Sequence, residues 1–412
     1  MATELPIPET RVLAIASHVR LALHVGNTMA AFVMQYLGCE VAAMHTVNYS
    51  NHTAYKRVKG RKTPADEIAE LYEGLKQSDL NEFDMMLSGY IPSAEVVEVV
   101  GKIGRDLKFN AGTKPGSFFW VLDPVMGDNG KLYVPEGIVP AYKSLLREAD
   151  LILPNQFEAE ILSDIKIDSL ASLAAAIQNL HRTYLLPHVI ITSVRLPAST
   201  SATPRPSIPA STAAHTTPAA AQTSTPAQPL VLTIVGSTST SSHAPRIFRI
   251  DVPAFPHFFS GTGDMFAALT VARLREAVMA TSGGDDGGVA RTPHWRSPDD
   301  VAPADLPLAR AAQMVLASMH AVLEDTAARA DATMAEDGEG AGKEGGGAGR
   351  EKKEMRRHVA RMKAAEVRVV RNAALLRAPP DVERFKPRAL EVGVADEVGG
   401  KEPDELGVVK LG

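Results

Sequence analysis

The chain has 412 residues, of which 45% are hydrophobic and 22% are charged, and its formal net charge is −5 at pH 7. This hydrophobic content is enough for a sizeable core, and the length allows one large α/β domain or two ordinary domains. The negative net charge argues against a general nucleic-acid binder, because such proteins carry an excess of Lys and Arg. The sequence contains no run of about 18 uncharged apolar residues, which argues against a membrane-spanning helix.

Cys39 is the only cysteine, so no intrachain disulfide can form. This usage is typical of a reducing compartment. The first residues, MATELP, lack a basic segment followed by an apolar run, so a secretory signal peptide is not expected. These features predict a soluble protein of the cytoplasm, with the nucleus as a second compartment, and with neither membrane nor nucleic-acid partners.

Apolar runs of strand length alternate with segments of helical periodicity along most of the chain. Strands are expected at 11–17, 40–47, 84–88, 118–122, 150–153, 188–193, 230–235 and 246–252. Helices are expected at 27–37, 64–77, 93–109, 155–162, 169–184 and after Gly263. The polar residues 48–59 suit a hairpin or flap. The alternation predicts an α/β fold with a central, mostly parallel β-sheet flanked by helices.

Three segments of low complexity interrupt this pattern. Residues 198–229 are almost entirely Ala, Ser, Thr and Pro; residues 281–304 are rich in Gly, Asp and Pro; residues 335–354 are rich in Gly and charged residues. Such segments bury too little apolar surface to offset the loss of chain entropy on folding. They are therefore predicted to be disordered insertions into a single domain that spans residues 1–412.

The most informative motif is Gly261-Thr262-Gly263-Asp264, which leads into an amphipathic helix. Glycines lack a Cβ, so the backbone here can turn tightly and bring its N–H groups close to a ligand. N–H groups at a helix N-terminus attract anions. The Asp264 carboxylate could then take a proton from a hydroxyl group that attacks a phosphoryl group. An ordinary helix start with an acidic residue in its first turn explains the same residues.

Two aspartates follow the strand expected at 118–122. Asp123 and Asp128 are separated by a Pro/Gly turn, so both carboxylates can face one cation or a row of phosphate oxygens. Mg²⁺ needs only one or two carboxylates, because it usually keeps several waters. A plain turn, in which Asp forms local hydrogen bonds, is the alternative.

Polar side chains also follow the next two expected strands. Asn155 and Glu158 have the spacing of a capping box, and the same two side chains suit a site for Mg²⁺ and phosphate. Thr192 and Ser193 add hydroxyl groups at the end of the following strand. In parallel sheets, ligands bind at the carboxyl ends of the strands, which is where all these side chains are expected.

The first strand and the expected flap supply groups of another kind. Ser17 ends the first strand, and the flap contains Ser50-Asn51-His52-Thr53 between Tyr49 and Tyr55. Interleaved aromatic and polar side chains suit a planar heterocycle, and equally suit a solvent-facing hairpin. The 12 histidines show no metal-ligand spacing, and the sequence contains neither a Walker A nor a G-x-S-x-G motif.

Short segments along the whole chain carry a resemblance to a known family. They are RVLAIASHV (11–19), VGN (25–27), VNYSNHTAY (47–55), ELYEGL (70–75), LSGY (87–90), LDPVMGD (122–128), YVPE (133–136), PNQFEAE (154–160), VIITS (189–193), GTGDMFAA (261–268) and EVRVVRN (366–372). In these segments the chain resembles the pyridoxal kinases of the ribokinase-like superfamily. The last segment resembles the family's closing strand. The three low-complexity segments fall between the matching blocks.

The resemblance implies ATP-dependent phosphorylation of the 5′-hydroxymethyl group of pyridoxal, pyridoxine and pyridoxamine in the salvage of vitamin B6. It implies Asp264 as the catalytic base and the N–H groups of Gly261, Thr262 and Gly263 as stabilisers of the transferring phosphoryl group. Residues implied to bind the vitamer are Asp264, Ser17, Thr53, Tyr90, Val25, Tyr49 and His52. Residues implied to bind ATP are Asp123, Tyr133, Thr192, Val252, Pro253, Ala254, Phe255, Thr262 and Gly263. Residues implied to bind metal are Asp123, Asp128 and Glu158.

The same resemblance implies Mg²⁺ or another divalent cation such as Zn²⁺, a monovalent cation (K⁺ or Na⁺), and a homodimer. Three features depart from the family pattern: Leu153 replaces a common threonine, residues 252–255 lack a basic residue that is often present, and the lid between Asp128 and Tyr133 is short. A related kinase for hydroxymethylpyrimidine or a sugar is the alternative enzyme, although pyrimidine kinases often have Cys in place of Asp264. An inactive kinase-like binding protein is the alternative from another class.

Overall fold

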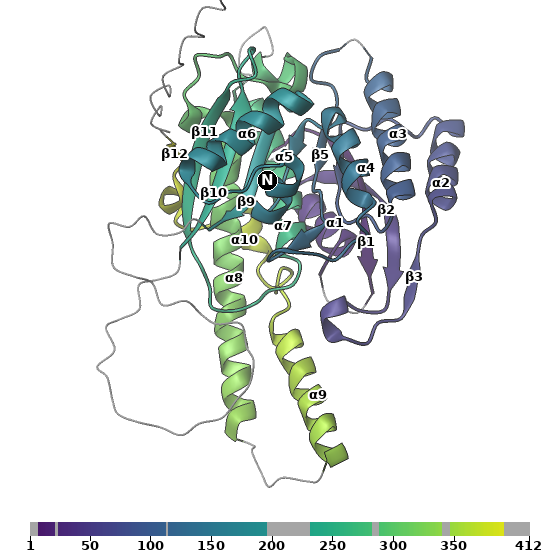
Figure 1. The fold of residues 1–412 in the computed structure, drawn as a ribbon, viewed down its shortest axis with the longest axis vertical. Coiled ribbons are helices and arrows are strands. Elements are labelled where there is room, and N and C mark those ends of the chain that lie inside the picture. Colours follow the sequence, from purple (N-terminus) through teal and green to yellow (C-terminus); the bar gives the residue numbers. More distant parts are fainter. Residues whose placement is uncertain are drawn as a thin grey trace, which may run out of the picture.

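The computed structural model describes residues 7–20, 24–112, 114–195, 231–281, 288–339 and 347–390 (Figure 1). The insertion predicted at 198–229 lies outside these ranges. Within them, no helix combines the length and the apolar composition that crossing a bilayer requires.

One ten-stranded sheet forms the centre of the described chain, in the order β12-β11-β10-β9-β8-β5-β4-β1-β2-β3. The six strands from β9 to β2 run parallel, and β10, β11, β12 and β3 pair antiparallel at the two edges. The strands are β1 (Thr10–Val19), β2 (Cys39–Tyr49), β3 (Gly60–Lys62), β4 (Met85–Ser88), β5 (Phe119–Leu122), β8 (Leu151–Ile152), β9 (His188–Val194), β10 (Val231–Ser239), β11 (Pro245–Pro253) and β12 (Arg388–Ala389). A separate hairpin pairs β6 (Gly127–Asp128) with β7 (Lys131–Leu132). This sheet confirms the predicted α/β fold.

Both faces of the sheet are buried, which explains why the central strands are apolar throughout. In β1, Val12 and Ala14 belong to one core cluster, while Leu13 and Ile15 belong to the other. The alternation follows from the period of two in a strand, which sends successive side chains to opposite faces. Each face therefore needs its own layer of helices.

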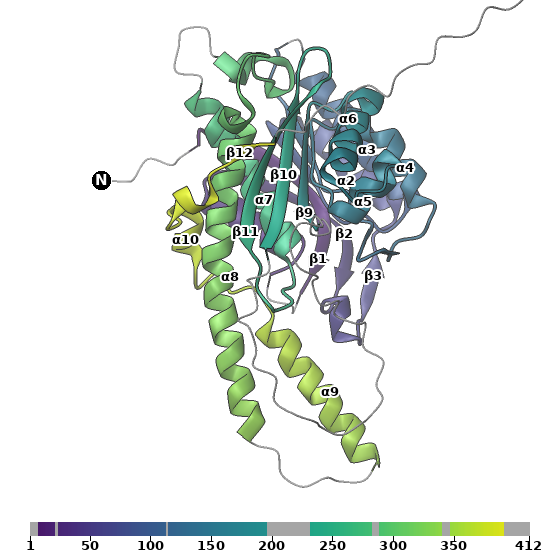
Figure 2. The same ribbon diagram turned by 60° about the vertical axis from the view of Figure 1, so that its left-hand side comes forward.

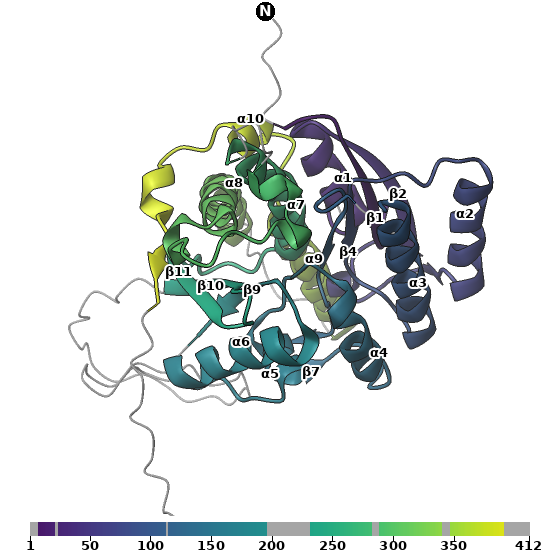
Figure 3. The same cartoon turned by 90° about the horizontal axis from the view of Figure 1, so that it is seen from above.

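The two helical layers lie on opposite sides of the sheet (Figure 3). One core cluster packs beneath α1 (Asn27–Tyr36), α7 (Thr262–Ala280), α8 (Pro307–Glu339) and α10 (Ala373–Arg377). The other packs beneath α2 (Ala65–Gln77), α3 (Ala94–Asn110), α4 (Ile138–Leu145), α5 (Gln156–Ser163) and α6 (Leu170–Tyr184). Helix α7 is the most deeply buried of its layer, since most of its side chains from Met265 to Arg275 are buried. This packing holds the first turn of α7 beside the carboxyl ends of the parallel strands.

The segment 288–304 is packed against the body, so the prediction of a disordered insertion is wrong for these residues. It contains three short 3-10 helices, η3 (Gly288–Arg291), η4 (Pro293–Trp295) and η5 (Pro303–Asp305). The Trp295 side chain is 1% exposed and stacks on Phe119, with 4.2 Å between the ring centroids. Its Nε1 donates to the carbonyl of Gly116 at 2.9 Å. Polar contacts add to this packing, since the Arg246 guanidinium donates to the carbonyl of Ser297 at 3.1 Å and Ser241 donates to Asp299.

The third predicted insertion is also helical where it is described. Residues 335–339 end α8, and residues 347–354 begin α9 (Gly347–Ala364). The prediction of a disordered insertion is therefore wrong for these residues. Both helices extend beyond the sheet as a pair (Figures 1 and 2). The expected closing strand at 366–372 is not a strand either, because only Glu366 forms a bridge, with Ser260.

We predict that Trp295→Ala lowers the free energy of unfolding by about 3–5 kcal/mol, because it leaves a large cavity against Phe119. Urea denaturation measures this loss. Phe109→Ala is the control, since Phe109 is 84% exposed and its truncation should change the free energy by no more than about 0.5 kcal/mol. Equal stabilities of the two variants would contradict the packed position of residues 288–304.

Candidate active site

A cavity of about 640 Å³ lies where β1, β2, β4 and β5 end and α7 begins. We call it the first cavity. The structure brings together there every residue that was predicted to hold the ring, namely Ser17, Val25, Tyr49, His52, Thr53, Tyr90 and Asp264. The predicted residues Gly261, Thr262, Gly263, Asp123, Asp128 and Tyr133 line the same cavity. Side chains from distant parts of the sequence thus converge at one edge of the sheet.

Two glycines allow close backbone contacts at the β1–α1 connection, Gly26 with the end of β1 and Gly261, at the start of α7, with the connection itself. Gly26 has φ +57°, and a Cβ on it would lie 2.1 Å from the carbonyl oxygen of Ser17. Gly261 has φ +84°, and a Cβ on it would lie 2.5 Å from the carbonyl oxygen of His24. Any larger residue at either position would have to push these backbones apart. The close approach sets the distance between Ser17 and Asp264.

The N-terminus of α7 is open to a ligand. Gly261 is its N-cap in the left-handed conformation, and no side chain caps the helix. The N–H groups of a first helical turn have no partner within the helix, and the helix dipole adds a partial positive charge there. This turn can therefore bind an anionic oxygen.

Asp264 lies in that first turn, at the floor of the first cavity. Burial raises the pKa of the Asp264 carboxyl to about 6, and a hydrogen bond from the Gly26 N–H acts in the opposite direction. A carboxylate with this pKa is ionised at neutral pH and is a much better proton acceptor than an ordinary aspartate. The geometry therefore provides a base beside an anion-binding turn.

Two further carboxylates surround this turn. Asp123 follows β5, and its Oδ2 lies 4.0 Å from the position of a Cβ on Gly263. Burial, together with the neighbouring Glu158 and Asp264 carboxylates, raises the pKa of Asp123 well above its usual value. Burial also raises the pKa of Glu158 to about 7. Excess negative charge accumulates here, which a bound cation would relieve.

Glu158 also has a structural role that explains its burial. Its Oε1 accepts the Met126 N–H at 2.8 Å and the Gly127 N–H at 3.3 Å, and its Oε2 accepts the Asn155 N–H at 2.9 Å. Asn155 and Glu158 form a complete capping box at the start of α5. A capping box and a place beside a cation site are therefore compatible interpretations of this segment, because the Glu158 side chain both caps α5 and adds negative charge near Asp123.

The donor set fits a divalent cation that keeps most of its own water. Within the described ranges, no group of three or more His, Cys, Asp or Glu side chains is arranged to hold a metal ion. Mg²⁺ is commonly held by one or two carboxylates together with waters and substrate phosphates. Asp123 lines the cavity and fits such a ligand, whereas both Glu158 oxygens already accept backbone N–H groups. The exposed Asp128 accepts from Asn129 through both of its oxygens.

A second cavity, of about 340 Å³, adjoins the first and shares Asp128 and Phe258 with it. Ser193, Lys166 and Arg195 also line it, so it presents a hydroxyl and two cationic side chains. Phe258 is 62% exposed and lies between the two cavities. Phe258 was not predicted as a site residue, although an aromatic residue three positions before Gly261 is a usable signal.

Some residues predicted to bind ATP line neither of these cavities. Thr192 is one residue short of the second cavity, whose lining includes Ser193 instead. Val252 and Phe255 pack against the hydrophobic core, and the Phe255 ring stacks on His320 with 5.0 Å between the centroids. Leu153 is buried in the same core.

The short lid is a tight hairpin between β6 and β7. Asn129 and Gly130 occupy its turn, both with positive φ, as a two-residue hairpin turn requires. Tyr133 follows the hairpin, lines the first cavity and is 58% exposed.

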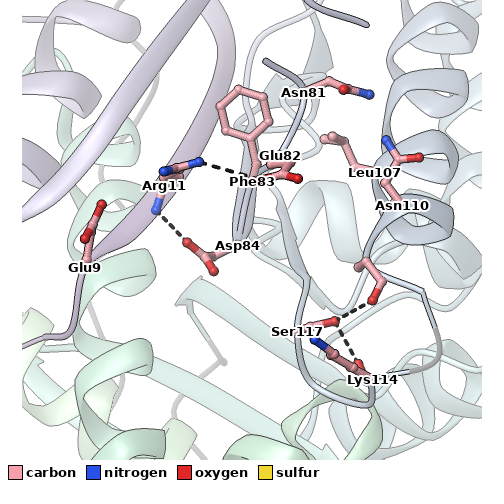
Figure 4. Close-up of a pocket in the computed structure, with 11 residues that line it drawn as sticks. Glu9, Arg11, Asn81, Glu82, Phe83, Asp84, Leu107, Asn110, Lys114 and Ser117 are labelled. Carbon is pink, nitrogen blue, oxygen red and sulfur yellow. Dashed lines mark hydrogen bonds and ion pairs between the residues drawn. The ribbon is translucent and has the colours of Figure 1, made fainter. Parts of the chain in front are cut away.

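A third cavity, of about 540 Å³, lies at the other end of the strands, near the start of β1 and β4 (Figure 4). The Arg11 backbone N–H donates to Asp84 at 2.8 Å, and the Arg11 guanidinium lies 3.8 Å from Glu82. The C-terminal end of α3 borders it, where a helix dipole is negative. The first cavity is therefore the candidate active site.

Comparison with known proteins agrees with this geometry. A family model described as phosphomethylpyrimidine kinase matches residues 35–219. Human pyridoxal kinase is 36% identical over 274 residues, which cover 64% of this chain and 77% of the human protein. The chain belongs to the pyridoxal kinase family. The Arabidopsis thaliana pyridoxal kinase is 32% identical over 271 residues, which cover 65% of this chain and 75% of that protein.

The pyridoxal kinase family also accounts for the fold. A solved structure of the Leishmania donovani pyridoxal kinase in complex with ADP and pyridoxamine has a TM-score of 0.64 and 25% identity, covering 92% of this chain and 99% of that chain. The ribokinase-like fold and the resemblance carried by segments such as GTGDMFAA are thereby confirmed.

For this member of the pyridoxal kinase family, we predict that Asp264→Asn raises the melting temperature at pH 7.5. The folded-state pKa of Asp264 is about 6, against an ordinary value of 3.8. Ionisation of Asp264 therefore destabilises the folded state, and this loss develops as the pH rises from about 4 to about 6. Thermal denaturation should show that Asp264→Asn is only slightly more stable than the wild type at pH 4, and that the difference becomes larger and then constant above about pH 6.5.

Asp106→Asn is the matched control, and its melting temperature is expected to change in the opposite direction. Burial opposes ionisation of Asp106, but hydrogen bonds from Tyr72 and Lys76 outweigh it and lower the pKa of that carboxyl. Its replacement should lower the melting temperature at pH 7.5. A lower melting temperature for Asp264→Asn at that pH would contradict the raised pKa.

Proposed function

We propose that this protein transfers the γ-phosphoryl group of ATP to the 5′-hydroxymethyl group of pyridoxal, and also of pyridoxine and pyridoxamine. The product from pyridoxal is pyridoxal 5′-phosphate. The observation that carries the proposal is the position of Asp264, a base of pKa about 6 that lies both in a ring-sized cavity and in the open first turn of α7. Family membership and the ADP and pyridoxamine bound by the Leishmania enzyme support it.

The first cavity suits a substituted pyridine ring. Ser17, Thr53 and Tyr90 offer hydroxyl groups that can hydrogen-bond the ring substituents, while Val25 and Tyr49 offer apolar contact to its faces. Burial lowers the pKa of His52, so its imidazole is neutral at physiological pH. Side chains of this kind recognise a heterocycle through directional hydrogen bonds to its substituents and contact with its faces.

The reaction uses these groups in one displacement. The Asp264 carboxylate accepts the proton of the 5′-hydroxyl, and the hydroxyl oxygen forms a bond to the γ-phosphorus as the bond to the β-phosphate oxygen breaks and ADP leaves. The N–H groups of Gly261, Thr262 and Gly263 stabilise the negative charge on the transferring group. Most of the catalysis comes from positioning and charge stabilisation, since no covalent enzyme intermediate is needed.

The cation and nucleotide sites belong to the same proposal. Asp123, with Glu158 and Asp128 nearby, would hold Mg²⁺ or another divalent cation such as Zn²⁺, which neutralises phosphate charge when bound. A monovalent cation, K⁺ or Na⁺, would share this negative region. Tyr133 and Thr192 would contact ATP, and residues 252–255 would lie beside the nucleotide. The Arg195 guanidinium and the Ser193 hydroxyl of the second cavity support a nucleotide that extends toward them. Lys166, which lines the same cavity, is paired with Glu160 at 2.6 Å.

We further propose a cytoplasmic homodimer, with the nucleus as a second compartment. The resemblance to the pyridoxal kinases supports the homodimer. The presence of a single cysteine, Cys39, supports a reducing compartment, because the chain can form no intrachain disulfide. Cys39 is buried, and burial raises the pKa of its thiol to about 12.

We predict that the purified protein with Mg-ATP phosphorylates pyridoxal in preference to hydroxymethylpyrimidine, ribose and fructose. A coupled ADP-release assay over this panel of substrates measures the preference. Asp264→Asn should lower kcat by at least about 100-fold, because it removes the base, while circular dichroism shows an unchanged fold. A kcat/KM that is higher for hydroxymethylpyrimidine than for pyridoxal would show that the proposed substrate is wrong. Activity of Asp264→Asn near that of the wild type would refute the role of Asp264.

The pH profile provides an independent prediction. Because Asp264 must be ionised to accept a proton, kcat/KM for pyridoxal should fall below about pH 6 and be about tenfold lower at pH 5 than on the plateau. Steady-state kinetics between pH 4.5 and 8 measure this fall in kcat/KM. A profile that stays flat down to pH 4.5 would exclude a base with a pKa of about 6.

A further inference from the structure

The flap over the first cavity contains the short 3-10 helix η1 (Thr53–Tyr55). Thr53 and the preceding His52 line the cavity, so the position of this turn sets one wall of the site. A three-residue helix has too few internal hydrogen bonds to hold a position by itself. The contacts that hold the flap therefore bear directly on substrate binding.

Hydrogen bonds within the flap fix its shape. The Asn51 side chain donates to the carbonyl of Arg57 at 2.8 Å, and Ser50 and Lys59 pair through their backbones at 2.7 Å. His52 caps η1 by accepting the Ala54 N–H at 3.2 Å. These bonds join flap residues to one another, so they leave open how the flap is held over the cavity.

The flap is tied to the C-terminal part of the chain by two side chains. His358, in α9, lies 2.7 Å from the carbonyl oxygen of Ala54 through its Nε2. The Tyr55 hydroxyl donates to the carboxylate of Glu366, which follows α9 and is 8% exposed. Figures 1 and 2 both show α9 beside the segment that leads into β3.

Glu366 is also joined to the other wall of the site through its backbone. It forms a parallel bridge with Ser260, and the Ser260 N–H donates to the carbonyl of the adjacent Ala365 at 3.3 Å. Ser260 directly precedes the N-cap of α7. One buried residue thus connects the flap that carries Thr53 to the turn that carries the anion-binding N–H groups.

We propose that Glu366 is a positioning residue that, through Tyr55, holds the flap closed on the first cavity in register with the α7 turn. The proposal rests on the function proposed above. A flap that is already in place loses less conformational freedom when substrate binds, so the brace strengthens substrate binding. It does not act on the reacting atoms. Its loss should therefore raise KM for pyridoxal more than it lowers kcat.

Kinetics of single and double variants test the brace. Tyr55→Phe keeps the ring that packs near Val19 and Val25 and removes only the hydroxyl. Tyr55→Phe and Glu366→Ala should each raise KM for pyridoxal about tenfold, with kcat and KM for ATP within about twofold of the wild type. The double variant should be no worse than either single variant, because both break the same interaction. Glu366→Gln should be milder, since its amide oxygen still accepts the Tyr55 hydroxyl.

Tyr72→Phe is the matched control, because the Tyr72 hydroxyl donates to Asp106 at 2.7 Å on the α2–α3 pair, and neither residue lines the first cavity. It also removes one tyrosine–carboxylate hydrogen bond. A KM for pyridoxal in Tyr55→Phe no higher than in Tyr72→Phe would overturn the proposal, as would equal rises in KM for pyridoxal and for ATP.

Hydrogen–deuterium exchange tests, without measuring activity, whether Tyr55 and Glu366 hold the flap in place. Amides of residues 50–59 should exchange faster in Tyr55→Phe and Glu366→Ala than in the wild type and in Tyr72→Phe. Unchanged exchange would overturn the brace whatever the substrate of the enzyme. A wild-type protein that phosphorylates no B6 vitamer would instead refute the proposed function, and the exchange experiment would still decide whether Glu366 holds the flap.

Discussion

The site depends on the close approach of two backbones, the β1–α1 connection and the first turn of α7. Gly261 makes this approach possible, because a Cβ there would overlap the carbonyl oxygen of His24. Gly26 lets the connection fold back on β1, where a Cβ would overlap the carbonyl oxygen of Ser17. The approach delivers the Gly26 N–H to the Asp264 carboxylate and brings Ser17 within the same cavity. Substrate recognition and base positioning therefore rest on one packing constraint, rather than on two independent features.

The second theme of the site is negative charge that is held out of water. Burial and the neighbouring Glu158 and Asp264 carboxylates raise the pKa of Asp123, while burial and Asp128 raise that of Glu158. Burial alone raises the pKa of Asp264. An arrangement of this kind costs stability, and active sites commonly carry such costs. It also prepares the site for partners of opposite charge, because a cation brought in with a nucleotide would lower the electrostatic free energy of all three carboxylates.

Much of this architecture could be predicted from the sequence because it depends on local signals. The apolar run of β1, the capping box at Asn155 and the Gly261–Asp264 turn are each determined by a few adjacent residues. Features that depend on long-range packing could not be predicted. The stacking of Trp295 on Phe119 and the hydrogen bond between Tyr55 and Glu366 join residues that are far apart in the chain. Composition alone therefore misassigned residues 288–304 and the helical ends of 335–354 as disordered.

The antiparallel pairing of β9 with β10 has a consequence for the segment between them. Val194 lies opposite Thr233, so the chain leaves the sheet and returns to it at neighbouring positions. The entropic cost of closing such an excursion grows only slowly with its length, so the sheet tolerates additional residues there. The exit point also borders the second cavity, through Ser193 and Arg195. A fluorescent protein or reporter dye attached directly after Arg195 would join the chain beside the proposed nucleotide pocket without interrupting β9 or β10. This junction is therefore a natural position for an optical sensor of ligand binding.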